Sequence, residues 1–142
     1  MEEVCSKQEM CRHDIEKKLI KYGLSDKEKE VLMKTLMQEK FVDESRYASF
    51  FVHDKWKINK WGRIKIQHHL RQKRIPEACI QDALDEIDEE TYISVLRELL
   101  AEKNKSIKDK NPYHRKAKLM RYAMSRGFEQ ELVFDEIDRL LD

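Results

Sequence analysis

The chain has 142 residues, of which 40% are charged, yet its 29 basic and 28 acidic residues almost cancel to a net charge of +1. This near balance excludes a uniformly basic or acidic protein, so any charged binding surface must come from how the charges are distributed along the chain. Only three glycines and two prolines are present, which excludes a turn-rich sheet protein and favours helices joined by short connections.

The N-terminal residues carry no targeting or metal-binding signal. They lack the basic start and apolar stretch of a secretory signal, and no run in the chain approaches the roughly 18 apolar residues of a membrane helix. Cys5, Cys11 and His13 have a spacing that matches no zinc pattern, and a fourth ligand is missing. We therefore expect a soluble, cytoplasmic protein that needs no metal ion and no cofactor.

Apolar residues recur at helical spacing through most of the chain. Gly23 and Gly127 suit the left-handed position that ends a helix, whereas Arg74 occupies the corresponding position in the middle of the chain and predicts backbone strain there. Residues 63–67 alternate like a strand, but the repeat described next favours a helix. The predicted helices are 3–22, 26–39, 44–59, 62–73, 77–87, 89–104, 112–126 and 129–141.

An internal repeat organises these helices. With Leu24, Ile75 and Phe128 taken as equivalent, apolar residues recur nine and five positions before them and nine and twelve positions after them. Each pair of helices should therefore form a hairpin whose apolar turn residue fills the corner. A third helix opens at the acidic pairs Asp43-Glu44 and Asp88-Glu89, and the last copy lacks it.

The fold class that follows is all-α, with three tandem repeats of a three-helix module in an elongated array whose last repeat is truncated. The predicted modules are residues 1–56, 57–106 and 107–142.

Positive charge is concentrated in two segments. Residues 55–76 contain no acidic residue, and residues 103–126 contain one, Asp109. A charge run is usually a solvated helix face, but blocks of one sign keep like charges close, which costs stability unless a partner compensates. We therefore predict a basic surface for the phosphates of nucleic acid or the carboxylates of a protein. The predicted binding residues are Lys55, Lys57, Lys60, Trp61, Arg63, Lys65, Arg71, Lys73, Arg74, Arg115, Lys116, Lys118 and Arg121.

The aromatic residues divide between scaffold and surface. Trp56 lies near an apolar run, and Tyr47 and Tyr92 occupy equivalent repeat positions, so all three should pack in the core. Trp61 stands within the first basic segment, where stacking on a base and packing against a protein partner both fit.

Motifs of catalytic sites are missing from the sequence. It contains no phosphate-binding loop, no G-x-S-x-G, no H-E-x-x-H and no C-x-x-C. The prediction is a binding protein with no catalytic residues, and the residues alone leave open a nucleic-acid-binding module or a scaffold that binds only proteins.

One string of residues in the middle of the chain is typical of a known family. It comprises Phe41-Val42-Asp43-Glu44, Arg46-Tyr47-Ala48, Phe51-Val52 and Trp61-Gly62-Arg63, followed by Ile66, Leu70, Lys73 and Ile75. The string resembles the RecX family, bacterial regulators of the RecA recombinase built from three tandem three-helix repeats. The resemblance implies a protein that binds RecA filaments on single-stranded DNA. We further expect a monomer, and duplex DNA is a candidate second partner. The resemblance also implies that the protein modulates filament growth, ATP hydrolysis and strand exchange, and we expect this modulation to be inhibition.

Overall fold

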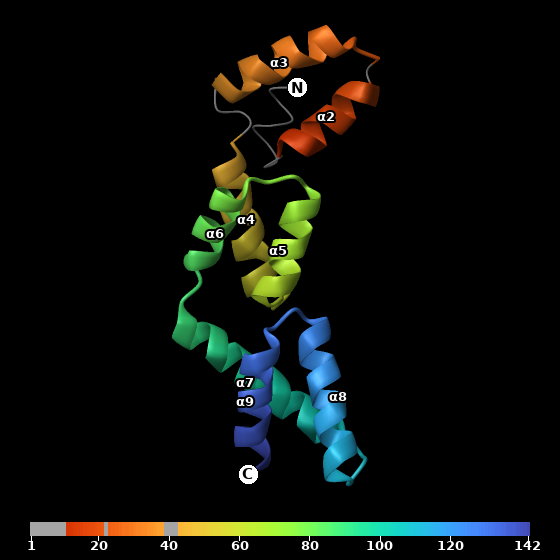
Figure 1. The fold of residues 1–142 in the computed structure, drawn as a ribbon, viewed down its shortest axis with the longest axis vertical. Coiled ribbons are helices and arrows are strands. Elements are labelled where there is room, and N and C mark those ends of the chain that lie inside the picture. The colour runs from red at the N-terminus through yellow and green to blue at the C-terminus, as the bar shows by residue number, and fades with distance from the viewer. Residues whose placement is uncertain (1–10, 22, 39–42) are drawn as a thin grey trace. The chain divides into compact units, whose positions relative to one another are not determined.

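The computed structural model describes residues 11–21, 23–38 and 43–142, and every regular element in these ranges is a helix (Figure 1). The prediction of an all-α protein is therefore confirmed, and residues 63–67 lie in a helix. None of these helices has the length and apolar character needed to cross a membrane. The elements are α2 (Arg12–Lys21), α3 (Asp26–Gln38), α4 (Glu44–Lys57), α5 (Arg63–Gln72), α6 (Glu77–Asp85), α7 (Glu89–Ser106), α8 (Pro112–Ser125) and α9 (Gln130–Leu141).

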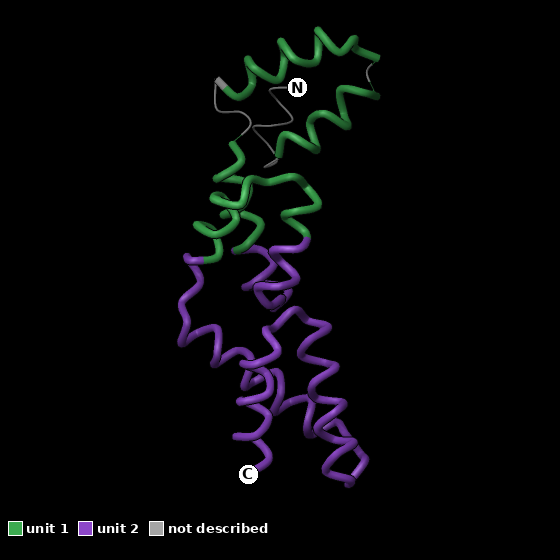
Figure 2. Tube along the Cα trace, in the orientation of Figure 1, with its two compact units in different colours: residues 1–52, 69–84 green, residues 53–68, 85–142 purple. Residues whose placement is uncertain are grey.

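The chain forms two compact units (Figure 2). Unit 1 contains residues 1–52 and 69–84, and unit 2 contains residues 53–68 and 85–142. The boundaries fall inside α4 and α5, so each unit includes part of both helices.

In unit 1, α2 and α3 pack through the apolar stripe that the repeat predicts. Ile15 and Leu19 of α2 are fully buried against Met33 and Leu36 of α3, and the turn residue Leu24 packs against the same cluster. Spacings of three and four residues place each pair on one face of its helix, so the two apolar faces meet in one cluster.

The backbone of the hairpin turns follows the predicted pattern. Gly23 and Gly127 have φ angles of 71° and 96°, the left-handed conformation that glycine adopts without steric cost. Arg74 also has a positive φ, 58°, so the predicted strain in the middle turn is confirmed. Lys60 shares this conformation with a φ of 55°, and this left-handed residue was not predicted.

The core of unit 2 is built by α7, α8 and α9 around aromatic side chains. Tyr92 is fully buried, its ring 5.2 Å from that of Trp56 and 5.1 Å from that of Phe128. Tyr47 in unit 1 is buried as well, so the core prediction for Trp56, Tyr47 and Tyr92 is confirmed. Asp88 starts α7 by accepting a hydrogen bond from the Thr91 amide, 3.0 Å away.

Within unit 2, the turn between α4 and α5 is bound to the turn between α8 and α9 through the backbone. The Gly62 amide donates to the Arg126 carbonyl at 2.7 Å, and the Ile64 amide donates to the Gly127 carbonyl at 3.0 Å. A Cβ atom on Gly62 would lie 2.3 Å from the Gly127 carbonyl carbon. Only glycine therefore permits this contact, which we call the turn joint.

Candidate nucleic-acid interface

A groove in unit 2 brings together cations from the second basic segment. It has a volume of about 750 Å³ and is lined by the end of α7, the following loop and one face of α8. Four of its lining residues are cationic and none is acidic. We call it the α8 groove; its lining residues are Lys103, Ser106, Ile107, Lys108, Lys118, Arg121, Tyr122 and Ser125.

Helical geometry explains why these side chains converge. Lys118, Arg121, Tyr122 and Ser125 are spaced by three, four and seven residues, which places them on one face of α8. Pro112 opens this helix at a position where its missing amide costs nothing.

The loop between α7 and α8 is held by Arg115. Its guanidinium donates to the Asn104 carbonyl at 2.9 Å, to the Ile107 carbonyl at 3.1 Å and to the Asp109 carbonyl at 3.0 Å. It also donates to the Asn104 side chain at 2.6 Å. One arginine thus caps the last carbonyls of α7 and fixes where the loop leads into α8. The guanidinium is committed to the scaffold that shapes the α8 groove.

The electrostatics of the α8 groove favour an anionic ligand. Lys108, Lys118 and Arg121 are exposed, and no ion pair joins them to a carboxylate within the described part of the chain. The Lys103 ammonium lies over the Tyr122 ring, 5.3 Å from its centroid. Unpaired cations on a wet surface lose little hydration energy when phosphate oxygens approach, and several together produce salt-dependent binding.

Asp109 is the one acidic residue of the second basic segment, and it has partners of its own. It accepts hydrogen bonds from the Asn111 amide at 2.9 Å and from His114 at 3.0 Å. The pKa of Asp109 is lowered by the Asn111 amide, then by His114 and by the charges of His114 and Lys118. Asp109 therefore stays ionised and organises the loop, but it cancels only part of the positive charge.

The remaining predicted cation of α8, Lys116, is neutralised within the molecule. Its ammonium pairs with Asp138 of α9 at 2.7 Å and lies over the Phe134 ring, 4.2 Å from the centroid. Of the four residues predicted on this helix, the structure brings Lys118 and Arg121 together in the α8 groove. It gives Arg115 and Lys116 intramolecular partners.

The first basic segment is divided between the units. Arg71, Lys73 and Arg74 belong to unit 1, where Arg71 pairs with Glu77 and Lys73 with Asp14. The other predicted residues of this segment belong to unit 2: Lys55, Lys57, Lys60, Trp61, Arg63 and Lys65.

Arg63 is the most heavily engaged of these predicted residues. Its guanidinium pairs with Glu129 at 2.8 Å and with Glu89, and its central carbon lies 3.9 Å from the centroid of the Tyr92 ring. Its backbone amide donates to the Tyr92 hydroxyl at 3.0 Å. Although burial lowers the pKa of Arg63, the hydrogen bonds to both carboxylates raise it above its ordinary value. Arg63 thus joins α5, α7 and the start of α9.

We expect Arg63→Lys to lower the free energy of unfolding by about 2 kcal/mol. A lysine cannot form ion pairs with both carboxylates and stack on the Tyr92 ring at the same time. Urea denaturation followed by far-ultraviolet circular dichroism, which reports on the helices of both units, measures the loss. The matched control is Arg71→Lys, whose ion pair with Glu77 is exposed and should contribute less than about 1 kcal/mol. Equal losses for the two variants would show that Arg63 is not a structural centre.

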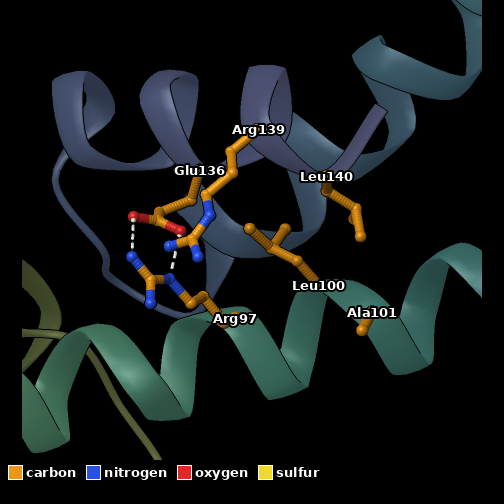
Figure 3. A pocket seen from close by; sticks show the side chains of 6 residues that line it. All are labelled: Arg97, Leu100, Ala101, Glu136, Arg139 and Leu140. Carbon is orange, nitrogen blue, oxygen red and sulfur yellow. Dashed lines mark hydrogen bonds and ion pairs between the residues drawn. The ribbon is translucent and has the colours of Figure 1, made fainter. Parts of the chain in front are cut away.

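Other depressions on the surface contain carboxylates. A pocket of about 310 Å³ between α7 and α9 holds Arg97 and Glu136, with Leu100 and Leu140 beside them (Figure 3). Glu136 is buried and binds the Arg97 guanidinium at 2.7 and 3.3 Å, so this charge is already satisfied. A second depression, on α9, is acidic through Glu131 and Asp135. Neither suits a phosphate chain as the α8 groove does.

Of the eight residues that line the α8 groove, only Lys118 and Arg121 were in the predicted binding set, and the other six were not predicted. Lys103 and Lys108 lie in the second basic segment, and Tyr122 follows Arg121. Helical spacing from Lys118 and Arg121 could have identified Tyr122, whereas nothing in the sequence shows that the end of α7 lies beside α8.

The cysteines show no sign of a metal centre where the structure describes them. Across residues 11–21, 23–38 and 43–142, no group of three or more histidine, cysteine, aspartate or glutamate side chains is placed to hold an ion. Cys11 is buried, and burial raises the pKa of its thiol to about 11. Cys5 lies outside the described residues.

Two family models match the chain. "RecX, second three-helix domain" matches residues 43–84, and "RecX, third three-helix domain" matches residues 90–137. Together they cover more than half of the 142 residues. They group α4 with α5 and α6, and α7 with α8 and α9. The modules predicted from the sequence, residues 1–56, 57–106 and 107–142, begin and end at other positions than these family domains, and they stay a prediction.

Curated relatives named "Regulatory protein RecX" are similar over most of the chain. The protein of Clostridium acetobutylicum is 32% identical over 81% of this chain and 55% of its own length, and that of Clostridium tetani is 30% identical over 87% and 57%. The protein of Prosthecochloris aestuarii is 28% identical over 94% of this chain and 85% of its own length. The chain spans little more than half the length of the first two relatives.

Solved structures agree with this similarity. "Crystal structure of regulatory protein RecX" has a TM-score of 0.86 at 26% identity, covering 96% of this chain and 67% of that one. The structure of RecX from Lactobacillus salivarius has a TM-score of 0.87 at 17% identity, covering 97% and 90%, and shows a shared fold. The family models, the relatives and the fold lead to one conclusion, that the chain belongs to the RecX family.

Proposed function

We propose that the protein is a regulator of the RecA recombinase, which binds the recombinase filament on single-stranded DNA and inhibits filament growth, ATP hydrolysis and strand exchange. Membership of the RecX family is the observation that carries this proposal, because relatives bear the name "Regulatory protein RecX". On this proposal the protein acts by binding, without a catalytic residue or a cofactor, and it works as a monomer in the cytoplasm where the DNA lies.

The α8 groove supports the DNA-binding part of this proposal. Four cations and no carboxylate line it, and three of these cations, Lys108, Lys118 and Arg121, are exposed. Such a surface binds phosphates through counterion release. Tyr122 adds an aromatic ring, which is common where single strands are bound. The groove alone does not distinguish one nucleic acid from another, so the choice of a recombinase filament rests on the family.

An ATPase assay tests the proposal directly. The cognate recombinase is assembled on single-stranded DNA, and its rate of ATP hydrolysis is measured as the protein is added up to a stoichiometric amount. We expect the rate to fall, because a protein that blocks filament growth reduces the number of active subunits. An unchanged rate would contradict the proposed function.

A second candidate is a helical nucleic-acid-binding module without a recombinase partner, and the α8 groove favours it independently. A pull-down with the recombinase in the presence and absence of DNA separates the two. Capture without DNA supports direct regulation, whereas capture only through DNA supports the second candidate. A scaffold that binds only proteins would show no affinity for DNA even at low salt.

A further inference from the structure

The turn between α4 and α5 differs in chemistry from the α8 groove. Together with the first residues of α5, it exposes two large aliphatic side chains, Ile58 at 74% and Ile64 at 52%. Trp61 lies between them in sequence and is partly exposed. Clustered exposed apolar residues mark sites of protein interaction, and tryptophan is enriched among the residues that dominate binding energy there. The phosphates and base edges of a nucleic acid provide little apolar surface for such side chains to contact.

The Trp61 ring is accompanied by lysines. The Lys65 ammonium lies 4.4 Å from the ring centroid, and the Lys55 ammonium lies 5.1 Å away. A nucleobase that stacked here would meet these ammonium groups over the ring, whereas a carboxylate could approach them from outside while the ring keeps them in place. Lys55 has a carboxylate 3.8 Å away, that of Asp54. No ion pair joins Lys57, Lys60 or Lys65 to a carboxylate in the ranges that the structure describes.

The backbone of this turn is fixed before any partner arrives. The amides of four consecutive residues, 61–64, all donate to acceptors within unit 2 at 2.7 to 3.0 Å. The Asn59 carbonyl accepts a hydrogen bond from the Arg126 guanidinium. A rigid backbone lowers the entropic cost of binding, because little further ordering is required.

We infer that this turn is a protein-docking surface for a partner that presents carboxylates around an apolar side chain. We call it the Trp61 surface; it consists of Lys57, Ile58, Lys60, Trp61, Ile64 and Lys65. The lysines supply the charge complementarity, and Ile58, Trp61 and Ile64 supply the apolar contact. The inference rests on the proposed function, in which that partner is the recombinase and the DNA is held elsewhere, by the α8 groove.

The test replaces the aliphatic residues with acids in the full chain. Ile58→Asp and Ile64→Asp each remove an apolar contact and add a charge that repels an acidic partner. Because both side chains are exposed, the variants should fold, which circular dichroism checks. We expect each to weaken binding to the DNA-free recombinase about tenfold, measured by surface-immobilised binding, and to leave affinity for a single-stranded oligonucleotide unchanged. Val31→Asp, at a residue of unit 1 that is 62% exposed, is the matched control and should bind normally.

The outcomes separate the inference from the proposed function. If the unsubstituted protein binds the recombinase and both variants bind it equally well, the docking surface is overturned while the proposed function stands. If the variants instead lose affinity for the oligonucleotide, the surface contacts nucleic acid and the inference is wrong. If the unsubstituted protein fails to bind the recombinase and leaves its ATPase unchanged, both are overturned.

Discussion

Replacing Gly62 with alanine should lower the free energy of unfolding by about 3 to 5 kcal/mol. The added Cβ would lie 2.3 Å from both the carbonyl carbon and the carbonyl oxygen of Gly127 and 2.4 Å from the Phe128 amide nitrogen. These neighbours are backbone atoms and cannot turn aside, so the two segments must separate. Overpacking of this kind typically costs about 1 to 3 kcal/mol. Loss of the two hydrogen bonds of the turn joint adds about 1 kcal/mol each.

Far-ultraviolet circular dichroism during urea denaturation measures this effect and that of the control, because helices make up both units. The control is Gly23→Ala. A Cβ there meets nothing within 4 Å, but the φ of 71° is strained for any other residue, so about 1 to 2 kcal/mol should be lost. A Gly62→Ala variant as stable as Gly23→Ala would mean that the turn joint does not form in solution.

Reversing two charges of the α8 groove, with Lys118→Glu and Arg121→Glu combined, should weaken binding to single-stranded DNA about 100-fold at about 50 mM salt. Each phosphate contact to a single strand contributes a log-log slope of about 0.7 with salt, which corresponds to nearly tenfold in affinity at that concentration. The slope should therefore also fall by about 1.4. Anisotropy of a labelled oligonucleotide, titrated over a series of salt concentrations, measures both quantities.

A charge-matched control tells the groove apart from overall charge. Lys27→Glu combined with Lys34→Glu makes the same change in net charge on exposed positions of α3, and its salt slope should match that of the unsubstituted protein. If both double variants lose the same affinity, binding depends on net charge and the groove is not the DNA site. All four substituted side chains are exposed, so both double variants should keep the thermal stability of the unsubstituted protein.

The repeat was enough to predict the scaffold because its signal is local. Ile15, Leu19, Met33 and Leu36 are buried where the aligned positions predict. Helical periodicity repeats within a few residues, and buried positions must follow it in each copy. The left-handed backbone at Arg74 was predictable for the same reason, since the other two copies have glycine there.

The candidate site was only partly predictable, because pairing partners come from distant parts of the chain. Arg63 pairs with Glu129, which lies 66 residues further along the chain. Neither the residue types nor their spacing predicts that these two residues form an ion pair. On α8, Lys116 and Lys118 are equivalent as sequence, yet Asp138 neutralises the first alone. A basic run therefore shows where cations are available, whereas the carboxylates of neighbouring helices decide which of them remain free for a ligand.

The boundary between the two units has a consequence for how such a chain can change in evolution. Trp56 and Arg63 precede α6 in the sequence but complete the core around Tyr92, which follows it. Copies of the repeat are therefore not interchangeable pieces. Duplicating, deleting or swapping residues 43–84 as a block would bring a foreign tryptophan and arginine to the neighbouring copy's tyrosine. A protein with a different number or order of copies can arise this way only when the residues that contact one another between neighbouring copies change together.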